Sequence, residues 1–202
     1  MLQNHQQASQ FLSALDSDWA DLIATVGACT FEPRTACEPY EALVRAVAGQ
    51  QLHIKAAAAI TLKFINHFGE FPTPQQLLAA PFDDLRACGF SGRKIETIQG
   101  IASATMSGVV PSFAVAQTMT DEALIKQLVT LKGIGQWTVE MLLMFTLARM
   151  DILPADDFGV VQGYKRLKKR EAAPKRKEMA EIAQAWAPHR TVASWYLWRV
   201  PK

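Results

Sequence analysis

Apolar residues recur along most of the chain at the three- and four-residue spacing of amphipathic helices, as in Leu43, Val44 and Val47. No stretch alternates apolar and polar residues over the length of a strand. The pattern therefore predicts an all-α protein. Helices are expected over residues 8–16, 18–26, 40–48, 51–68, 91–108, 121–131, 136–149, 158–167, 174–186 and 190–200, with two short pieces inside 71–89 and a loop or short helix over 111–119.

Residues suited to helix ends mark several of these bounds: Ser17 or Asp16 before the second helix, Gly69 after residue 68, Pro74 and Pro81 in first turns, and Thr120 before residue 121. A middle segment of about 40–150 is flanked in sequence by the chain's own ends. We therefore expect two helical lobes around a cleft. One lobe holds residues 40–150, including a helical hairpin over 121–149, and the other combines residues 1–39 with 151–202.

The composition is that of a folded protein with an apolar core. Half of the 202 residues are hydrophobic, which excludes a disordered chain. No apolar run approaches the ~20 residues that a bilayer span needs, and the start, MLQNHQQASQ, lacks the pattern of a signal peptide. The three cysteines, Cys29, Cys37 and Cys88, lack the spacing of metal ligands. An intracellular protein with free thiols is expected.

Charge is distributed unevenly along the chain. Residues 1–150 hold 10 Lys and Arg against 13 Asp and Glu, whereas residues 151–202 hold 11 against 6, so the two parts carry −3 and +5. The excess is concentrated in Lys165–Lys177, KRLKKREAAPKRK. Such a run is typical of a solvated surface and, less often, of a surface that binds nucleic acid.

A short glycine turn, Lys132-Gly133-Ile134-Gly135, joins two expected helices. Glycine has no Cβ, so the backbone can turn tightly and approach a ligand. The first amides of the next helix lack intrahelical acceptors, and the helix dipole favours an anion there. The turn therefore suits a phosphate, with Ile134 packed inward. From the turn alone, a plain helix–turn–helix corner is an equally good interpretation.

Two acids, Asp156 and Asp157, stand where the next helix is expected to begin. Either could be its N-cap, and one could cap while the other points into a cleft. A 14-residue helix over 136–149 covers ~21 Å, and residues 150–156 can span at most ~25 Å. The chain can therefore bring Asp157 back towards the glycine turn.

These segments resemble a known family. LKGIGQWTVE at 131–140, followed by PADDFGVVQGY at 154–164, is similar to the helix-hairpin-helix DNA glycosylases, whose hairpin precedes a Gly/Pro-rich loop and an aspartate. The likeness extends to YEALVRAVAGQQLHIKAAAAI upstream and WAPHRTVASWYLWR downstream, so that about 38–200 is covered. The alkylated-base branch, of the 3-methyladenine DNA glycosylase II type, is the most similar. The resemblance implies that family's fold, with a DNA-binding cleft.

The resemblance also implies site residues. Asp157 corresponds to the catalytic aspartate, Gln51 to the residue that fills the gap left by a flipped nucleotide, and His53 to a neighbour facing the minor groove. The base pocket is expected to involve Trp137, Met141, Phe158 and His189, with Trp186 in or near it. Expected DNA contacts are Gln51, Leu52, His53, Lys132, Gly133, Ile134, Gly135, Gln136 and Thr138. Without the resemblance, the sequence favours a core position for Trp137 and for most of the cluster over 186–198. Exposed positions are then expected for Gln51 and His53, and the sequence does not decide between core and surface for Tyr196.

The sequence departs from parts of the family. Trp137 stands where strand-cutting members have a lysine, so no Schiff-base nucleophile is available and no lyase step is expected. The sequence has no cysteines spaced for an iron–sulfur cluster, and no extra N-terminal β-containing domain of the kind found in larger bacterial members is expected. His189 stands where some relatives have an aromatic pocket residue.

The expected function is removal of alkylated purines from double-stranded DNA by hydrolysis of the N-glycosidic bond. Asp157 would stabilise the oxocarbenium-like transition state and orient water. The alternative from another class is a non-catalytic DNA-binding module that uses the hairpin alone. Repair of oxidised purines is disfavoured by the missing lysine. We expect no cofactor, with a monovalent cation at the hairpin left open, and a monomer without membrane contact in the cytoplasm or nucleoid, or in a eukaryotic nucleus.

Overall fold

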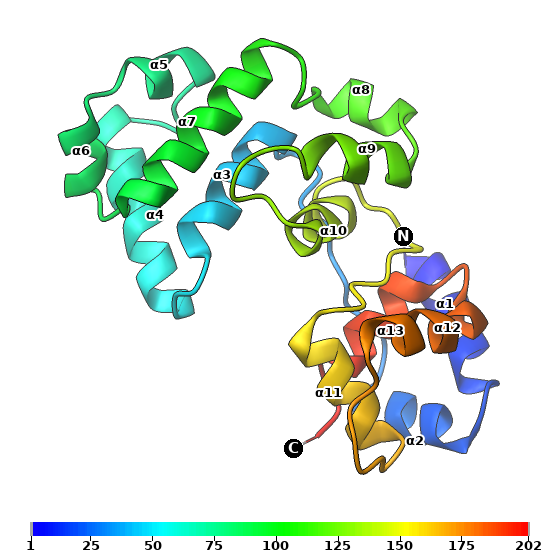
Figure 1. Ribbon diagram of the computed structural model, residues 1–202. Helices are drawn as coiled ribbons and strands as arrows, with labels where there is room; N and C mark the ends of the chain where they lie inside the picture. Colours follow the sequence, from blue (N-terminus) through cyan, green and yellow to red (C-terminus); the bar gives the residue numbers. More distant parts are fainter. Residues whose placement is uncertain (1, 202) are drawn as a thin grey trace. The chain divides into compact units, whose positions relative to one another are not determined.

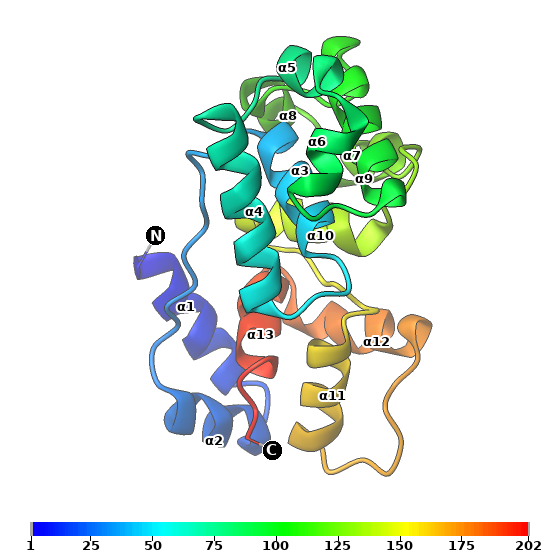
Figure 2. The same cartoon turned by 90° about the vertical axis from the view of Figure 1, so that its left-hand side faces the viewer.

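Helices form all the regular secondary structure of residues 2–201, and no strand occurs among them (Figures 1 and 2). The structure is a computed structural model, and it describes residues 2–201 apart from the side chains at positions 2–4 and 54. The all-α class predicted from the apolar spacing is confirmed. None of the helices described here is both long and apolar enough to cross a bilayer.

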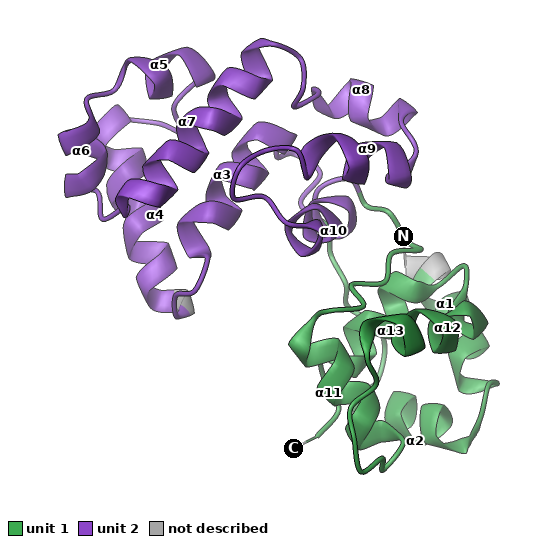
Figure 3. Ribbon diagram, viewed as in Figure 1, with its two compact units in different colours: residues 1–33, 148–202 green, residues 34–147 purple. Residues whose placement is uncertain are grey.

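The chain divides into two compact units (Figure 3). The middle unit comprises residues 34–147, and the terminal unit combines residues 1–33 with residues 148–202. The lobe bounds expected from the sequence lie near residues 40 and 150, whereas the compact units divide after residues 33 and 147.

The middle unit is organised around α7, whose residues Ile95, Ile98 and Ile101 are completely buried. Their helical spacing places them on one face, and α7 packs against α3 and α5. Ser91 caps α7 by accepting the Lys94 N–H at 3.3 Å. The helices of this unit are α3 (Pro39–Gly49), α4 (Ile54–Phe68), α5 (Pro74–Ala79), α6 (Phe82–Ala87), α7 (Gly92–Met106), α8 (Phe113–Thr118), α9 (Asp121–Leu128) and α10 (Gln136–Phe145).

The terminal unit brings the two ends of the chain together through α1–α2, α1–α13 and α11–α13 contacts. Its helices are α1 (Leu2–Ser13), α2 (Ser17–Val26), α11 (Phe158–Leu167), α12 (Arg176–Ile182), the 3-10 helix η1 (Ala183–Trp186) and α13 (Arg190–Leu197). Helices α11 and α13 approach so closely at Gly163 that a Cβ there would stand 2.0 Å from the Leu197 carbonyl oxygen. Only glycine fits this contact without a shift of the helices.

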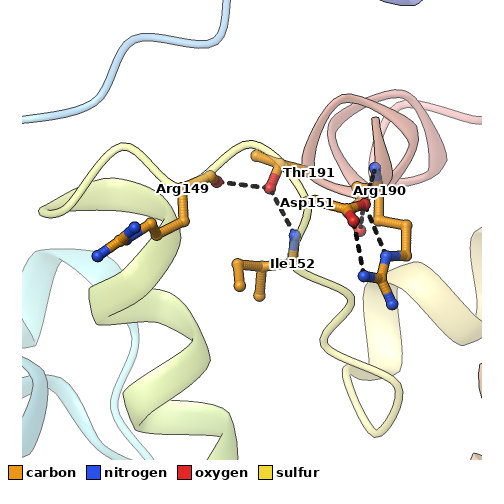
Figure 4. Close-up of polar contacts among 6 residues, drawn as sticks. Arg149, Asp151, Ile152, Arg190 and Thr191 are labelled. Carbon is orange, nitrogen blue, oxygen red and sulfur yellow. Dashed lines mark hydrogen bonds and ion pairs between the residues drawn. The ribbon is translucent and has the colours of Figure 1, made fainter. Parts of the chain in front are cut away.

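The segment that leads into α11 is fastened to the start of α13 (Figure 4). Thr191 Oγ1 donates to the Arg149 carbonyl at 2.8 Å and accepts the Ile152 N–H at 3.1 Å. The Arg190 guanidinium donates to both Asp151 oxygens, each at 2.7 Å. Burial raises the pKa of Asp151, but the hydrogen bonds and charge of Arg190 outweigh this and hold it below its usual value. A bidentate pair of this kind restricts the segment strongly.

Several predicted helix ends are confirmed. Asp16 rather than Ser17 caps α2, Gly69 ends α4, and Thr120 caps α9. Pro74 lies in the first turn of α5, as expected, but Pro81 is the N-cap residue of α6 and precedes its first turn.

Several predicted bounds are wrong. The first helix, expected over 8–16, is α1 at Leu2–Ser13, and two further differences affect the site. The helix expected from Gln51 begins at Ile54, because Gln51 has a left-handed φ of 57° and His53 is the N-cap. The helix expected over 136–149 ends at Phe145, because the Leu147 N–H turns back to the Leu142 carbonyl and Ala148 has a φ of 56°. Helix α10 is therefore shorter, at about 15 Å, and the connector before Asp157 is longer than expected.

The Gly163 contact generates a stability prediction. Gly163→Ala should lower the free energy of unfolding by about 1–3 kcal/mol, because the added methyl group must push α11 away from α13. Gly100→Ala in α7 is the matched control: its Cβ meets nothing within 4 Å, so it should stabilise by about 0.5–1 kcal/mol through helix propensity. Calorimetric melting of both variants checks the contrast, and equal melting temperatures would contradict it.

Candidate active site

The Asp157 carboxylate is held at the start of α11 by two hydrogen bonds to the same oxygen. As the N-cap, its Oδ1 accepts the Val160 N–H at 2.8 Å. The Trp198 indole Nε1–H donates to the same Oδ1 at 2.7 Å. A Cβ at Gly159 would stand 2.6 Å from Trp198 Cδ1 and 3.1 Å from Asp157 Oδ1. The glycine therefore lets the indole reach the carboxylate, and the helix N-terminus favours its negative charge.

The two adjacent acids have different surroundings. Asp156 is exposed, and its Oδ2 lies 2.8 Å from Arg176 Nη1. Asp157 is half-buried and is the residue that caps α11. The sequence left the capping role open between them, and the geometry assigns it to Asp157. The next residue, Phe158, leaves 79% of its surface exposed.

The other aromatic residues of the terminal unit mostly form its core. Trp186 is buried and packs its ring against Trp19 and Tyr164, so it supports the unit from inside. Tyr196, left undecided by the sequence, is completely buried, and its hydroxyl donates to the Gly27 carbonyl at 3.0 Å. His189 is half-buried at the start of α13, with its ring edge-to-face against Phe11 at 5.1 Å.

In the middle unit, the glycine turn is built as the sequence suggests. Gly133 has a φ of 83°, and a Cβ there would stand 2.6 Å from Thr97 Oγ1 on α7. Both the backbone conformation and the close approach therefore require glycine. The Ile134 side chain is buried, as predicted, and its N–H donates to the Leu131 carbonyl at 3.0 Å. Gly135 is the N-cap of α10 and has no side chain to cap the helix.

The side chains around this turn differ in their access to a ligand. Lys132 is exposed and pairs with Glu96 at 2.7 Å, an exposed pair that a phosphate could replace at little cost. The Gln136 side-chain amide donates to Glu140 Oε1 at 2.9 Å. The predicted DNA contact of Thr138 is wrong. Its side chain is buried and its N–H donates to the Gly135 carbonyl, so it offers no surface to DNA.

Trp137 and Met141 lie one turn apart on α10. Trp137 is 44% exposed, so the interpretation of its ring as a core residue is wrong. Met141 is half-buried. Their spacing of four residues places both on one face of the helix, where they can present an aromatic plane and a polarisable thioether.

Residues 51–53 form an exposed turn between α3 and α4. Gln51 and His53 are exposed, and Leu52 is 41% exposed. His53 Nδ1 accepts the Lys55 N–H at 3.3 Å, which places its ring at the start of α4. The Gln50 side-chain amide donates to the Gly133 carbonyl at 3.2 Å, so this turn and the glycine turn are directly bonded to each other.

Part of the basic run at 165–177 is paired within its own unit. Lys168 Nζ contacts Asp16 at 2.7 Å and Asp18 at 2.9 Å, and Arg170 pairs with Glu178. Burial lowers the pKa of Lys168, but the two carboxylates outweigh it and raise the pKa above its usual value. These pairs favour the interpretation of the run as a structural, solvated surface.

The predicted site residues fall into two groups. Asp157, Phe158, Trp186 and His189 belong to the terminal unit, and the remaining predicted residues belong to the middle unit. Within residues 2–201, no cluster of three or more His, Cys, Asp or Glu side chains is arranged to hold a metal ion.

A family model describes this combination of elements. The model for "HhH-GPD superfamily base excision DNA repair protein" matches residues 44–189. The chain therefore belongs to the HhH-GPD superfamily of base excision DNA repair proteins.

Particular relatives lie in the alkylated-base branch. The chain is 45% identical to DNA-3-methyladenine glycosylase 1 of Schizosaccharomyces pombe, over 97% of this chain and 87% of the relative. It is 36% identical to the alkylbase DNA glycosidase-like protein mag2 of the same organism, over 98% and 95%. The solved structure of S. pombe 3-methyladenine DNA glycosylase (Mag1) in complex with abasic DNA superposes with a TM-score of 0.86 at 44% identity, covering 96% of this chain and 95% of that one. The expected family and fold are confirmed.

The contact of Trp198 with Asp157 was not predicted from the sequence. This tryptophan stands in a run of aromatic residues, Trp195, Tyr196 and Trp198, of which the first two are buried, and the whole run reads as core. The structure makes Trp198 a hydrogen-bond donor to Asp157. Its distance of 41 residues from Asp157 gives the sequence no local signal for this contact.

Proposed function

We propose that this protein is a DNA glycosylase that flips alkylated purines out of double-stranded DNA and hydrolyses their N-glycosidic bonds. The Asp157 carboxylate carries the proposal. It is half-buried, fixed at a helix N-terminus and oriented by an indole N–H, whereas the neighbouring Asp156 carboxylate is paired with a surface arginine.

Asp157 would act on the sugar of the flipped nucleotide. Breaking the N-glycosidic bond leaves positive charge on the sugar ring, and a fixed carboxylate stabilises that charge and orients the attacking water. Oδ1 accepts hydrogen bonds from Val160 and Trp198, which fix the orientation of the carboxylate at the start of α11. Fixing one oxygen in this way reduces the reorganisation that the carboxylate undergoes as charge develops.

The middle unit would hold the DNA. The Gly133 to Gly135 turn would place backbone amides against a phosphate, with Lys132 adding positive charge. Gln51 would fill the space left by the flipped nucleotide, with Leu52 and His53 beside it. Its contacts there would offset part of the cost of unstacking the nucleotide, which is about a few kcal/mol. A monovalent cation at the hairpin remains a proposal, and the Gly133 carbonyl already accepts a hydrogen bond from Gln50.

Trp137 supports two parts of the proposal: that the substrates are alkylated purines, and that the base is released without cleavage of the DNA strand. Its exposed indole face would attract a cationic alkylated base by about 1–2 kcal/mol, and the half-buried Met141 lies one turn further along the same helix face. We propose Phe158 and His189, which belong to the terminal unit, as further contacts to the substrate. An indole cannot form a Schiff base with the sugar, so the phosphodiester strand stays intact after base release. We propose that the protein acts as a monomer on DNA in the nucleoid or nucleus.

The function is tested by replacing Asp157. Asp157→Asn should lower the rate of base release from methylated DNA by at least about 10²-fold, because the neutral amide no longer stabilises the charged sugar. Affinity for duplex DNA containing an abasic site should remain. Asp156→Asn is the matched control and should excise at the normal rate, because that carboxylate is paired with Arg176 at the surface.

Chromatography of released bases under single-turnover conditions and a binding titration give the two readouts. Normal excision by Asp157→Asn would overturn the assignment of the catalytic residue. If the unmodified protein binds abasic DNA and releases no base, the non-catalytic binding module is the better account.

The contact between Trp198 and Asp157 generates a separate prediction. Trp198→Phe retains an aromatic ring but removes the N–H donor to Oδ1, and a hydrogen bond to a charged group contributes about 1.5–3 kcal/mol. The rate of base release should therefore fall roughly 10- to 100-fold, with little change in affinity for abasic DNA. Trp195→Phe, on the same helix, is the control for loss of an indole and should excise close to normally. Equal rates in the two variants would refute the role of Trp198.

The two hairpin glycines should differ in their tolerance of a side chain. Gly133→Ala meets Thr97 and forces a left-handed alanine, whereas a Cβ at Gly135 meets nothing within 4 Å and the backbone φ there is −93°. Gly133→Ala should therefore weaken binding to all DNA sequences alike and reduce the salt dependence by about one phosphate contact. Gly135→Ala should have a smaller effect. Salt titrations of binding to two unrelated duplexes measure both, and a sequence-selective loss would contradict a phosphate contact.

A further inference from the structure

Gln51 occupies a backbone position that normally requires glycine. The Leu52 N–H donates to the Gly49 carbonyl at 3.2 Å, which closes a four-residue turn over 49–52. Gln50 has φ −53° and ψ 130°, and Gln51 has a φ of 57°. These values match a type II turn, in which the third residue needs a positive φ and is usually Gly or Asn.

A glutamine at this position is strained. A left-handed backbone is unfavourable for a residue with a Cβ, and such strain persists only where the surrounding structure imposes it. A glycine at position 51 would form the same turn without strain, but it would have no side chain to insert into DNA. The turn must therefore be held by contacts from outside it.

Lys94 provides one of these contacts. It lies in the first turn of α7, and its Nζ donates to the Ala48 carbonyl and to the Gln50 carbonyl, each at 2.9 Å. The first carbonyl belongs to the last turn of α3, and the second belongs to the residue directly before Gln51. Hydrogen bonds from an ammonium group are stronger than those between neutral groups, so Lys94 ties the type II turn to α7.

Gln50 provides the second contact, towards the hairpin. Its side-chain amide donates to the Gly133 carbonyl at 3.2 Å, and Gly133 itself lies against Thr97 of α7. Thr97 is one helical turn beyond Lys94. The first two turns of α7, which packs on α3 in Figure 1, therefore underlie both the turn that carries Gln51 and the turn that binds phosphate.

We propose that Lys94 and Gln50 are positioning residues, which hold Gln51 in its strained conformation and in fixed register with the phosphate-binding hairpin. The inference rests on the proposed function, because it concerns the insertion of Gln51 into the gap left by a flipped base. Phosphate binding by the hairpin then places Gln51 directly at the DNA stack, and no further ordering of the turn is needed at insertion.

The test is a double-substitution cycle on excision. Lys94→Met and Gln51→Ala should each lower the single-turnover rate of base release roughly 5- to 30-fold. The double variant should be no slower than Gln51→Ala alone, because Lys94 acts only through Gln51. Lys94→Arg keeps a cationic donor and should recover most of the rate. Lys63→Met removes an exposed lysine of α4 and should leave the rate unchanged.

Two further readouts separate positioning from general destabilisation. The fluorescence of 2-aminopurine beside an abasic site in duplex DNA reports insertion of a side chain, and Lys94→Met and Gln50→Leu should both reduce the change seen on binding. Gln51→Gly should raise the melting temperature of the free protein by a few degrees while it lowers excision, because it relieves the strain.

The outcomes distinguish the inference from the proposed function. If the unmodified protein releases no base from methylated DNA, the proposed function itself fails. If it releases bases but Lys94→Met and Gln51→Ala combine multiplicatively, or if Gln51→Gly does not stabilise the free protein, the positioning role is overturned while the glycosylase function stands.

Discussion

The packing of α11 against α13 fixes the position of the Asp157 carboxylate, the group that we propose to be catalytic. Gly163 brings the two helices together without an intervening side chain. The same packing places Trp198, at the end of α13, against Asp157, at the start of α11. The other end of α13 binds the preceding segment through Thr191 and the Asp151–Arg190 pair. One short helix therefore holds the carboxylate both from the side and through the chain that leads to it.

The middle unit uses α7 in a similar way. Its first turns contact two loops that are far apart in sequence, one around residue 50 and the other around residue 133. Loops that bind a ligand are mobile when nothing underlies them, but these two lie against the same helix and are hydrogen-bonded to each other. Exposed side chains for which we propose DNA contacts, such as Gln51 and Trp137, can then stand on a surface that does not need to be ordered when DNA binds.

Much of this architecture follows from the sequence because it is local. Apolar spacing predicts most of the helices, and the bounds of α11 agree because its cap and its apolar face both lie in the same stretch. The predictions fail where a long-range contact determines the backbone. The left-handed Gln51 depends on Lys94 in this way. The end of α10 differs, because a local backbone turn at Ala148 ends the helix where no glycine or proline marks it. The buried Thr138 and the indole donor Trp198 likewise reflect packing between helices, which a spacing pattern does not contain.

The central claim is that a fixed carboxylate releases the base, while Trp137, in place of a lysine, leaves the DNA strand intact. The most direct measurement follows both products in one reaction: methylated duplex DNA is incubated with the protein, free bases are separated by chromatography, and strand breaks are counted before and after alkali. The account predicts free methylated purines and strands that break only after alkali. Strand breaks before alkali, or DNA binding without any free base, would contradict it.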